Sequence, residues 1–140
     1  MIKQCNAVGV DIIADVVLNQ TTGADVADGK QTGVAGTEYN GSTGDYPGFA
    51  TEQYPEGITA SDFHSCSKNI SNYANQQEVQ ECRLSSMWDF DSESEKVQDI
   101  QSDYLAALWN AGVRGFRMDA VKHIHTDSMK AIKEKFAKKI

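Results

Sequence analysis

The sequence predicts an α/β fold, in which helices alternate with the strands of a parallel sheet. Two apolar runs of strand length, 12–18 and 113–120, are separated in the chain by a segment with helical periodicity. A helix over residues 1–8, closed by Gly9, is expected before the first run, and another helix after the second. The predicted order is helix, strand, long irregular segment, helix, strand and helix. This order is typical of α/β proteins.

The two predicted strands differ in where their polar residues fall. The first run is interrupted only by Asp15, and such a nearly continuous apolar run is typical of a strand buried on both faces of a parallel sheet. The second run carries Arg117 and Asp119 near its end. The segment between the strands, from 20 to about 87, is far longer than an ordinary connection.

Apolar side chains recur at three- and four-residue steps through 92–110, which indicates an amphipathic helix. They are Val97, Ile100, Tyr104, Leu108 and Ala111. Ser92 followed by Glu95 predicts a capping box at the start of this helix, and Gly112 is expected to end it. The last helix is expected to carry its apolar side chains on one stripe. This stripe consists of Met129, Ile132, Phe136 and Ile140.

The chain is acidic, with 13 lysine and arginine residues against 20 aspartate and glutamate residues and a formal net charge of −7. It therefore lacks the basic surface expected of a protein that binds nucleic acid or anionic membranes. The longest apolar runs are of strand length, so no transmembrane segment is predicted. We expect neither nucleic acid nor a membrane among its partners.

Arg117 and Asp119 are the residues that point most directly to chemistry. Residues two apart in a strand project from the same face, so these two are expected side by side, with Phe116 and Met118 on the other face. A guanidinium next to a carboxylate favours the ionised acid. An ionised acid suits a nucleophile or an electrostatic stabiliser. Taken alone, however, such a pair is more often a structural ion pair.

Two segments of the chain match signature regions of one enzyme family. They are DVVLN at 15–19 and GFRMDAVKH at 115–123. Shorter pieces between them match as well, at 62–64, 71–73 and 79–84. In this order and at this separation, the segments closely resemble the α-amylase family, glycoside hydrolase family 13, of the animal and actinobacterial type. The resemblance extends over nearly the whole chain.

The resemblance implies part of a TIM (β/α)8 barrel, with an irregular domain B inserted after the third strand. Residues 1–19 would form the end of the second helix and the third strand, and 20–88 would form domain B. Residues 89–140 would form the third helix, the fourth strand and the fourth helix. A complete barrel needs about 250 residues. We therefore expect the chain to be a piece of a longer enzyme and to be inactive by itself.

For function, the resemblance implies a retaining α-amylase that hydrolyses internal α-1,4-glucosidic bonds of starch or glycogen. Asp119 would be the nucleophile and Arg117 would hold it ionised and aligned. In chloride-activated relatives the matching arginine also contacts the chloride ion. Retaining hydrolysis needs a second carboxyl group about 5 to 5.5 Å from the first. The family's general acid is a glutamate on the fifth strand, and no segment here matches that strand.

Four residues match positions that contact sugar in the family. They are Gln20, Tyr73, Lys122 and His123. The family has a histidine where this chain has Gln20, and glutamine can donate a hydrogen bond but cannot become cationic. We therefore predict weaker transition-state stabilisation, an altered pH dependence or an altered specificity. Asp15 matches a family aspartate near the barrel mouth, with a structural role.

The resemblance also implies a calcium ion, which prefers oxygen ligands. Asn19 and Asp89 would donate side-chain oxygens, while Gln80 and His123 would offer backbone carbonyls. Without the resemblance, we would interpret Asn19 as a hydrogen-bonding residue at a strand end. We would interpret Asp89 as a residue at the entry to a helix.

The three cysteines cannot all pair with one another. In the resembling amylases the counterparts of Cys66 and Cys82 are bridged, which implies a disulfide here and an oxidising, extracellular setting. Such a bridge would stabilise the protein by about 3 kcal/mol in the loop-entropy model. Cys5 lacks the partner cysteine of animal amylases and is expected to be a free, part-buried thiol. We expect a secreted protein that is a monomer in its full-length form.

Two other functions fit the same motifs. One is a sister α-glucan-active enzyme with maltogenic or transglycosylating activity. The other is a non-catalytic carbohydrate- or calcium-binding relative, to which Gln20 lends slight support. A glutamate at the end of the fifth strand of the parent protein would indicate an enzyme, and its loss would indicate a binding protein.

Overall fold

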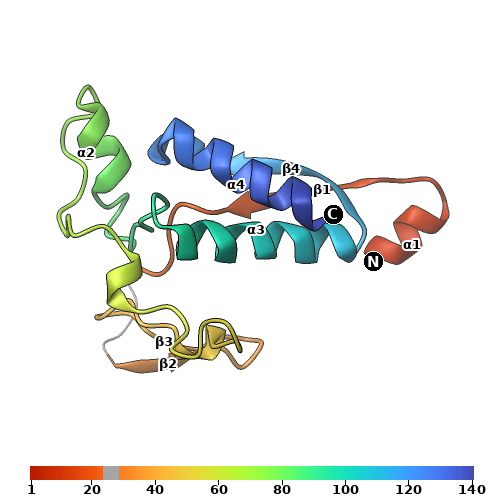
Figure 1. Ribbon diagram of the computed structural model, residues 1–140, viewed down its shortest axis with the longest axis horizontal. Helices are drawn as coiled ribbons and strands as arrows, with labels where there is room; N and C mark the ends of the chain where they lie inside the picture. The colour runs from red at the N-terminus through yellow and green to blue at the C-terminus, as the bar shows by residue number, and fades with distance from the viewer. Residues whose placement is uncertain (24–28) are drawn as a thin grey trace. The chain divides into compact units, whose positions relative to one another are not determined.

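The computed structural model describes residues 1–23 and 29–140 (Figure 1). Residues 24–28, a part of the predicted irregular segment, lie outside the described residues. The chain divides into two compact units, and each is described by itself. We call them the sheet unit, residues 1–19 with 92–140, and the loop unit, residues 20–91.

The sheet unit contains the expected alternation of helices and strands. Its elements are α1 (Ile2–Ala7), β1 (Ile12–Val17), α3 (Glu95–Asn110), β4 (Val113–Asp119), a short 3-10 helix (Val121–His123) and α4 (Thr126–Lys139). Strands β1 and β4 pair in parallel, with Asp15 opposite Arg117 and Val17 opposite Asp119. The predicted α/β order and the parallel pairing are therefore confirmed.

The core of the sheet unit lies between the two strands and the helices α3 and α4, which run side by side (Figure 1). Its buried members are Val16, Leu18, Leu105, Ile124 and Ile132. The ring of Phe136 meets Trp109 and Phe116 edge-on, at centroid distances of 6.0 and 5.5 Å. Even-numbered strand residues thus face the helices, as period-two alternation requires.

The described residues bury only one face of the first strand, whereas burial on both faces is predicted. Its burial alternates, and Ile13 and Val17 are 72% and 45% exposed. The helices α3 and α4 pack on the face that carries Val16. An apolar run of this kind is typical of a sheet covered on both faces, whereas here the odd-numbered side chains are accessible.

The predicted capping box at Ser92 is wrong, although the helix itself is confirmed. Helix α3 begins at Glu95, and the backbone N–H of Val97 donates to the side chain of Ser94. Ser92 is only 2% exposed, and its hydroxyl accepts a hydrogen bond of 2.9 Å from Gln101 Nε2. The same amide nitrogen donates to the carbonyl of Leu18 at 2.8 Å. This buried contact between the strand end and the helix takes Ser92 away from the cap.

Gly112 ends α3 as expected, with a φ of +108° that suits glycine. A Cβ at this position would lie 2.6 Å from Asn6 Nδ2. That amide donates to the carbonyl of Gly112 at 2.9 Å and so joins α1 to the α3–β4 turn.

The loop unit contains little regular structure. Its elements are β2 (Lys30–Thr32), β3 (Glu38–Asn40), the 3-10 helices Pro47–Phe49 and Ala60–Asp62, and α2 (Gln76–Glu81). Strands β2 and β3 form an antiparallel pair. Isolated bridges connect the remaining segments, among them Gln20 with Asp89 and Phe63 with Phe90.

Aromatic packing and one covalent bond hold the loop unit together. The ring of Phe63 stacks on Phe90 at 4.7 Å and meets Trp88 at 5.3 Å. The predicted disulfide between Cys66 and Cys82 is present, and Cys5 in the sheet unit is a free, part-buried cysteine as expected. Within 1–23 and 29–140, no helix is both long and apolar enough to cross a bilayer.

Candidate functional site

The carboxyl end of β4 brings Arg117 between two carboxylates. Its Nη2 lies 3.3 Å from Asp119 Oδ1, and its Nη1 donates to Asp15 Oδ1 at 3.1 Å. The expected proximity of Arg117 and Asp119 is found, because the two side chains leave the same face of the strand. Asp15 is a second partner that the sequence did not reveal, since it depends on the register between β1 and β4.

Asp15 is also the main influence on the charge of Arg117. Its hydrogen bond and its negative charge, followed by the charge of Asp119, raise the pKa of Arg117 above the ordinary value. The side chains of Arg117, Asp15 and Asp119 are 62%, 68% and 43% exposed, so solvent screens the attraction. The arrangement therefore matters more for the orientation of the Asp119 carboxylate than for stability.

A sharp turn follows Asp119 directly. Ala120 adopts the left-handed conformation, with φ 51°, which is uncommon for a residue other than glycine. The chain then enters the short 3-10 helix, and the backbone N–H of His123 donates to the carbonyl of Ala120 at 3.0 Å. Lys122 is exposed and His123 is only 3% exposed. Of these two expected sugar contacts, only Lys122 presents its side chain to solvent.

The residue after β1 is polar and buried as well. Asn19 is 1% exposed and, like His123, belongs to the sheet unit. The other two expected calcium ligands, Gln80 at 7% and Asp89 at 2% exposure, belong to the loop unit. All four are thus buried polar residues that offer oxygen atoms. This donor chemistry fits calcium, which takes carboxylate, amide and carbonyl oxygens.

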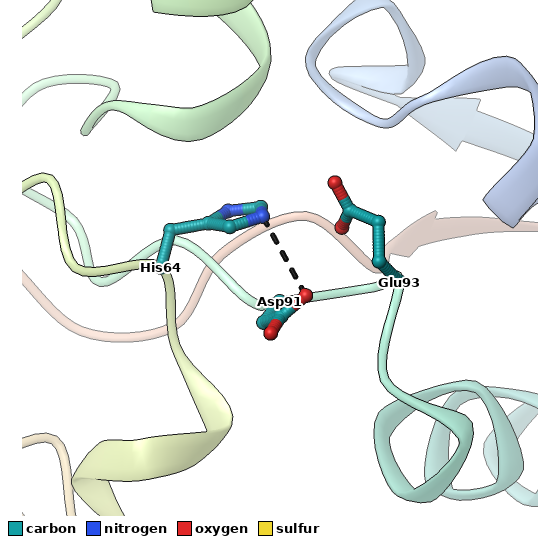
Figure 2. Close-up of side chains that lie close together, drawn as sticks. All are labelled: His64, Asp91 and Glu93. Carbon is teal, nitrogen blue, oxygen red and sulfur yellow. Dashed lines mark ion pairs between the residues drawn. The ribbon is translucent and has the colours of Figure 1, made fainter.

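Asp89 has a close partner in His64, which sequence analysis did not assign to the site. His64 Nδ1 lies 2.6 Å from Asp89 Oδ2, and the two residues also share a backbone hydrogen bond of 2.9 Å. The other ring nitrogen, Nε2, lies 3.7 Å from Asp91 Oδ1 (Figure 2). The resemblance included 62–64, but nothing local in the sequence pairs a histidine with a carboxylate 25 residues away.

Gln20 lies beside Asp89 through an isolated antiparallel bridge. Its side-chain oxygen is buried and has no hydrogen-bond partner in the described part of the chain. A buried polar atom in this position needs a partner such as a water molecule or a ligand.

Tyr73 is 57% exposed, in a loop that a buried carboxylate holds in place. Glu78 on α2 accepts hydrogen bonds from the backbone N–H of Ser71 at 2.6 Å, its hydroxyl at 2.7 Å and the backbone N–H of Asn72 at 3.2 Å. The bonds from Ser71 lower the pKa of Glu78, against the opposing effect of burial. The ring of Tyr73 is therefore accessible on an anchored loop.

Comparison with known proteins identifies the family. Residues 1–138 match the model of the alpha-amylase catalytic domain. The chain is 37% identical over 132 residues to an alpha-amylase of Pecten maximus, covering 94% of this chain and 25% of that protein. It is 41% identical over 138 residues to an alpha-amylase of Dermatophagoides pteronyssinus, covering 94% of this chain and 26% of that protein.

Solved structures of alpha-amylases also match the chain. The crystal structure of alpha-amylase I from Eisenia fetida matches with a TM-score of 0.83 and 35% identity, covering 96% of this chain and 26% of that chain. A mutant of the same protein, solved as a maltohexaose complex, matches with the same TM-score of 0.83 and covers the same 96% and 26%. The chain thus spans about a quarter of the length of these relatives.

Proposed function

Because the chain belongs to the family of alpha-amylase catalytic domains, we propose that it is a segment of a retaining α-amylase that hydrolyses internal α-1,4-glucosidic bonds of starch or glycogen. The single observation that carries this proposal is the placement of Arg117 between Asp119 and Asp15 at the carboxyl end of β4. Enzymes with this barrel architecture work at the carboxyl ends of their strands. The relatives named alpha-amylase and the maltohexaose complex of one of them support the reaction and substrate class.

In the proposed architecture, β1 and β4 are the third and fourth strands of a (β/α)8 barrel, and residues 20–88 are domain B. The parallel pairing and the helices packed on one face of the strands support this assignment. The accessible face carries Ile13, Arg117 and Asp119. In a barrel this face would be the interior, where residues alternate with those under the helices.

In the proposed mechanism, Asp119 attacks the anomeric carbon and forms the covalent glycosyl intermediate. Arg117 Nη2 lies 3.3 Å from Asp119 Oδ1 and keeps the carboxylate aligned. Asp15 holds the other terminal nitrogen of Arg117 and so restricts how the guanidinium can turn. The general acid would be a glutamate of the full-length protein. Chloride binding at Arg117 stays a prediction. A chloride ion there would compete with the carboxylates of Asp15 and Asp119 for the guanidinium.

We assign the proposed calcium ion to the side chains of Asn19 and Asp89 and the carbonyls of Gln80 and His123. Their low exposure and oxygen chemistry support the assignment. When bound, the ion would supply positive charge for the buried Asp89 carboxylate.

Sugar would be contacted by Gln20, Tyr73, Lys122 and His123. The exposure of Tyr73 and Lys122 supports contacts between their side chains and sugar. The burial of His123 favours a contact through its backbone. The disulfide Cys66–Cys82 supports secretion into an oxidising setting. A monomeric full-length protein stays a prediction.

The decisive experiment replaces Asp119 by asparagine in the full-length protein. We expect kcat on amylose to fall by about three orders of magnitude or more, as when other covalent nucleophiles are removed. Asp127→Asn, an exposed change in the first turn of α4, is the matched control and should leave kcat unchanged. Near-normal activity of Asp119→Asn would disprove the proposed nucleophile.

One observation favours a second candidate, a binding protein without catalysis. Gln20 stands in place of the expected histidine, and its buried side-chain oxygen lacks a partner in the described residues. A wild-type full-length protein that binds maltohexaose but does not cleave amylose would establish this alternative.

A further inference from the structure

We propose that His64 is a positioning residue for Asp89, whose carboxylate it holds through a hydrogen bond from Nδ1 to Oδ2. This inference deepens the proposed function and rests on the assignment of Asp89 as a calcium ligand. It concerns only residues of the loop unit.

The backbone fixes His64 relative to Asp89 before the side chains meet. The N–H of His64 donates to the carbonyl of Asp89 at 2.9 Å, and the N–H of Asp91 donates to the carbonyl of Asp62 at 3.0 Å. These two bonds flank the bridge between Phe63 and Phe90, whose rings stack at 4.7 Å. The backbone of His64 is therefore held by Asp89, the same residue that its side chain contacts.

The imidazole lies between two carboxylates and contacts them unequally. The distance from Nδ1 to Asp89 Oδ2 is 2.6 Å, whereas Nε2 lies 3.7 Å from Asp91 Oδ1 (Figure 2). The side chain of Asp89 is 1% exposed and that of Asp91 is 37% exposed. The short contact thus goes to the buried carboxylate, and Nδ1 is the nitrogen that donates to it.

A carboxylate as buried as Asp89 needs compensation for its lost hydration. His64 supplies a direct hydrogen bond, and Arg83 supplies charge at longer range. Burial lowers the pKa of Arg83, and the charge of Asp89 opposes that shift. The guanidinium of Arg83 lies over the Trp88 ring at 3.9 Å, so its geometry is set by packing on that ring. Among these partners, His64 is the one that fixes the rotation of the Asp89 carboxylate.

Hydrogen-bonded partners of this kind orient metal-ligating groups, and their loss typically reduces metal affinity by about 10- to 100-fold. We expect that range for His64→Ala in the full-length protein, measured as the calcium dissociation constant by competition with a chelator. The melting temperature in excess chelator should fall as well, because the buried Asp89 carboxylate loses its direct hydrogen bond. The stabilisation on adding calcium should shrink.

Two further substitutions separate positioning from simple packing. In asparagine the amide nitrogen can occupy the place of Nδ1, whereas in glutamine it reaches the place of Nε2. We therefore expect His64→Asn to restore most of the calcium affinity and His64→Gln to restore little. Asp91→Asn, which weakens the 3.7 Å contact of Nε2, is the matched control and should leave the affinity nearly unchanged.

The outcomes are distinguishable from those of the proposed function. If the wild-type protein binds calcium and His64→Ala binds it equally well, the role of His64 is refuted while the calcium site stands. Equal calcium affinities of His64→Asn and His64→Gln would also refute the positioning role of His64. This comparison tests the role even if His64→Ala fails to fold. If the wild-type protein binds no calcium, the calcium assignment and this inference both fail, and the glycosidase assignment is judged by Asp119→Asn.

Discussion

The sheet unit and the loop unit position their polar side chains by different means. In the sheet unit, the parallel register of β1 and β4 sets Asp15 opposite Arg117, and the alternation of the strand sets Arg117 beside Asp119. In the loop unit, Asp89 is held by a histidine side chain, isolated bridges and stacked rings. Regular structure can thus place a group through many repeated backbone bonds. An irregular segment depends on a few specific contacts.

This difference predicts how each unit responds to the loss of one contact. The sheet unit should depend on core volume, and the loop unit should depend on cross-links and on bonds to buried carboxylates. Three predictions, in order of decreasing effect, test the comparison in the full-length protein.

Leu105→Ala should have the largest effect on stability. Leu105 is 1% exposed in the core of the sheet unit, and removing such a side chain costs about 2 to 5 kcal/mol. The free energy of unfolding from denaturant titration measures the change. Leu108→Ala, on the same helix but only partly buried, should cost less. Equal losses for the two would mean that burial in this core does not govern stability.

Removal of the disulfide by Cys66→Ser with Cys82→Ser should destabilise the loop unit by about 2 to 4 kcal/mol. The bridge closes a loop in a unit with little regular structure, so its loss frees an otherwise weakly restrained chain. Hydrogen exchange of residues 62–91 should rise more than that of α3 and α4. Cys5→Ser is the control, because this cysteine is free. A uniform rise in both units would contradict the expectation that the bridge mainly restrains the loop unit.

Glu78→Gln should produce the smallest effect, one that depends on pH. The pKa of Glu78 is lowered in the folded protein by the hydrogen bonds from Ser71. A group with a lowered folded pKa contributes stability above its unfolded value of 4.5, and loses it as pH falls through the folded value. The melting temperature of the wild type should therefore exceed that of the variant at pH 6, and the gap should close towards pH 3. A difference in melting temperature that does not vary with pH would show that the lowered pKa of Glu78 is not its cause.

Much of the sheet unit could be predicted because its signals are local. Helix α3 follows from apolar residues at three- and four-residue steps, and its end follows from Gly112. The common face of Arg117 and Asp119 follows from the two-residue period of a strand. The cap of α3 was misplaced because Ser92 is drawn into a buried hydrogen bond with Gln101, a contact that local sequence does not contain.

The loop unit was harder to predict for a physical reason. Its short pieces have no period, so only the resemblance indicated that Cys66 pairs with Cys82 and that 62–64 belongs with the rest. His64 and Asp89 meet because two segments align around the Phe63–Phe90 stack. Such an alignment depends on which rings pack together, and ring packing leaves no regular spacing in the chain.

The amino-acid order by itself determined the alternation of helices and strands, the family and the face shared by Arg117 and Asp119. Each of these depends on neighbours within a few residues or on motifs that can be read directly. The tertiary structure alone decided that Asp15 also binds Arg117 and that His64 holds Asp89. These contacts join residues far apart in the chain, so they exist only once strand register and side-chain packing have brought the segments together.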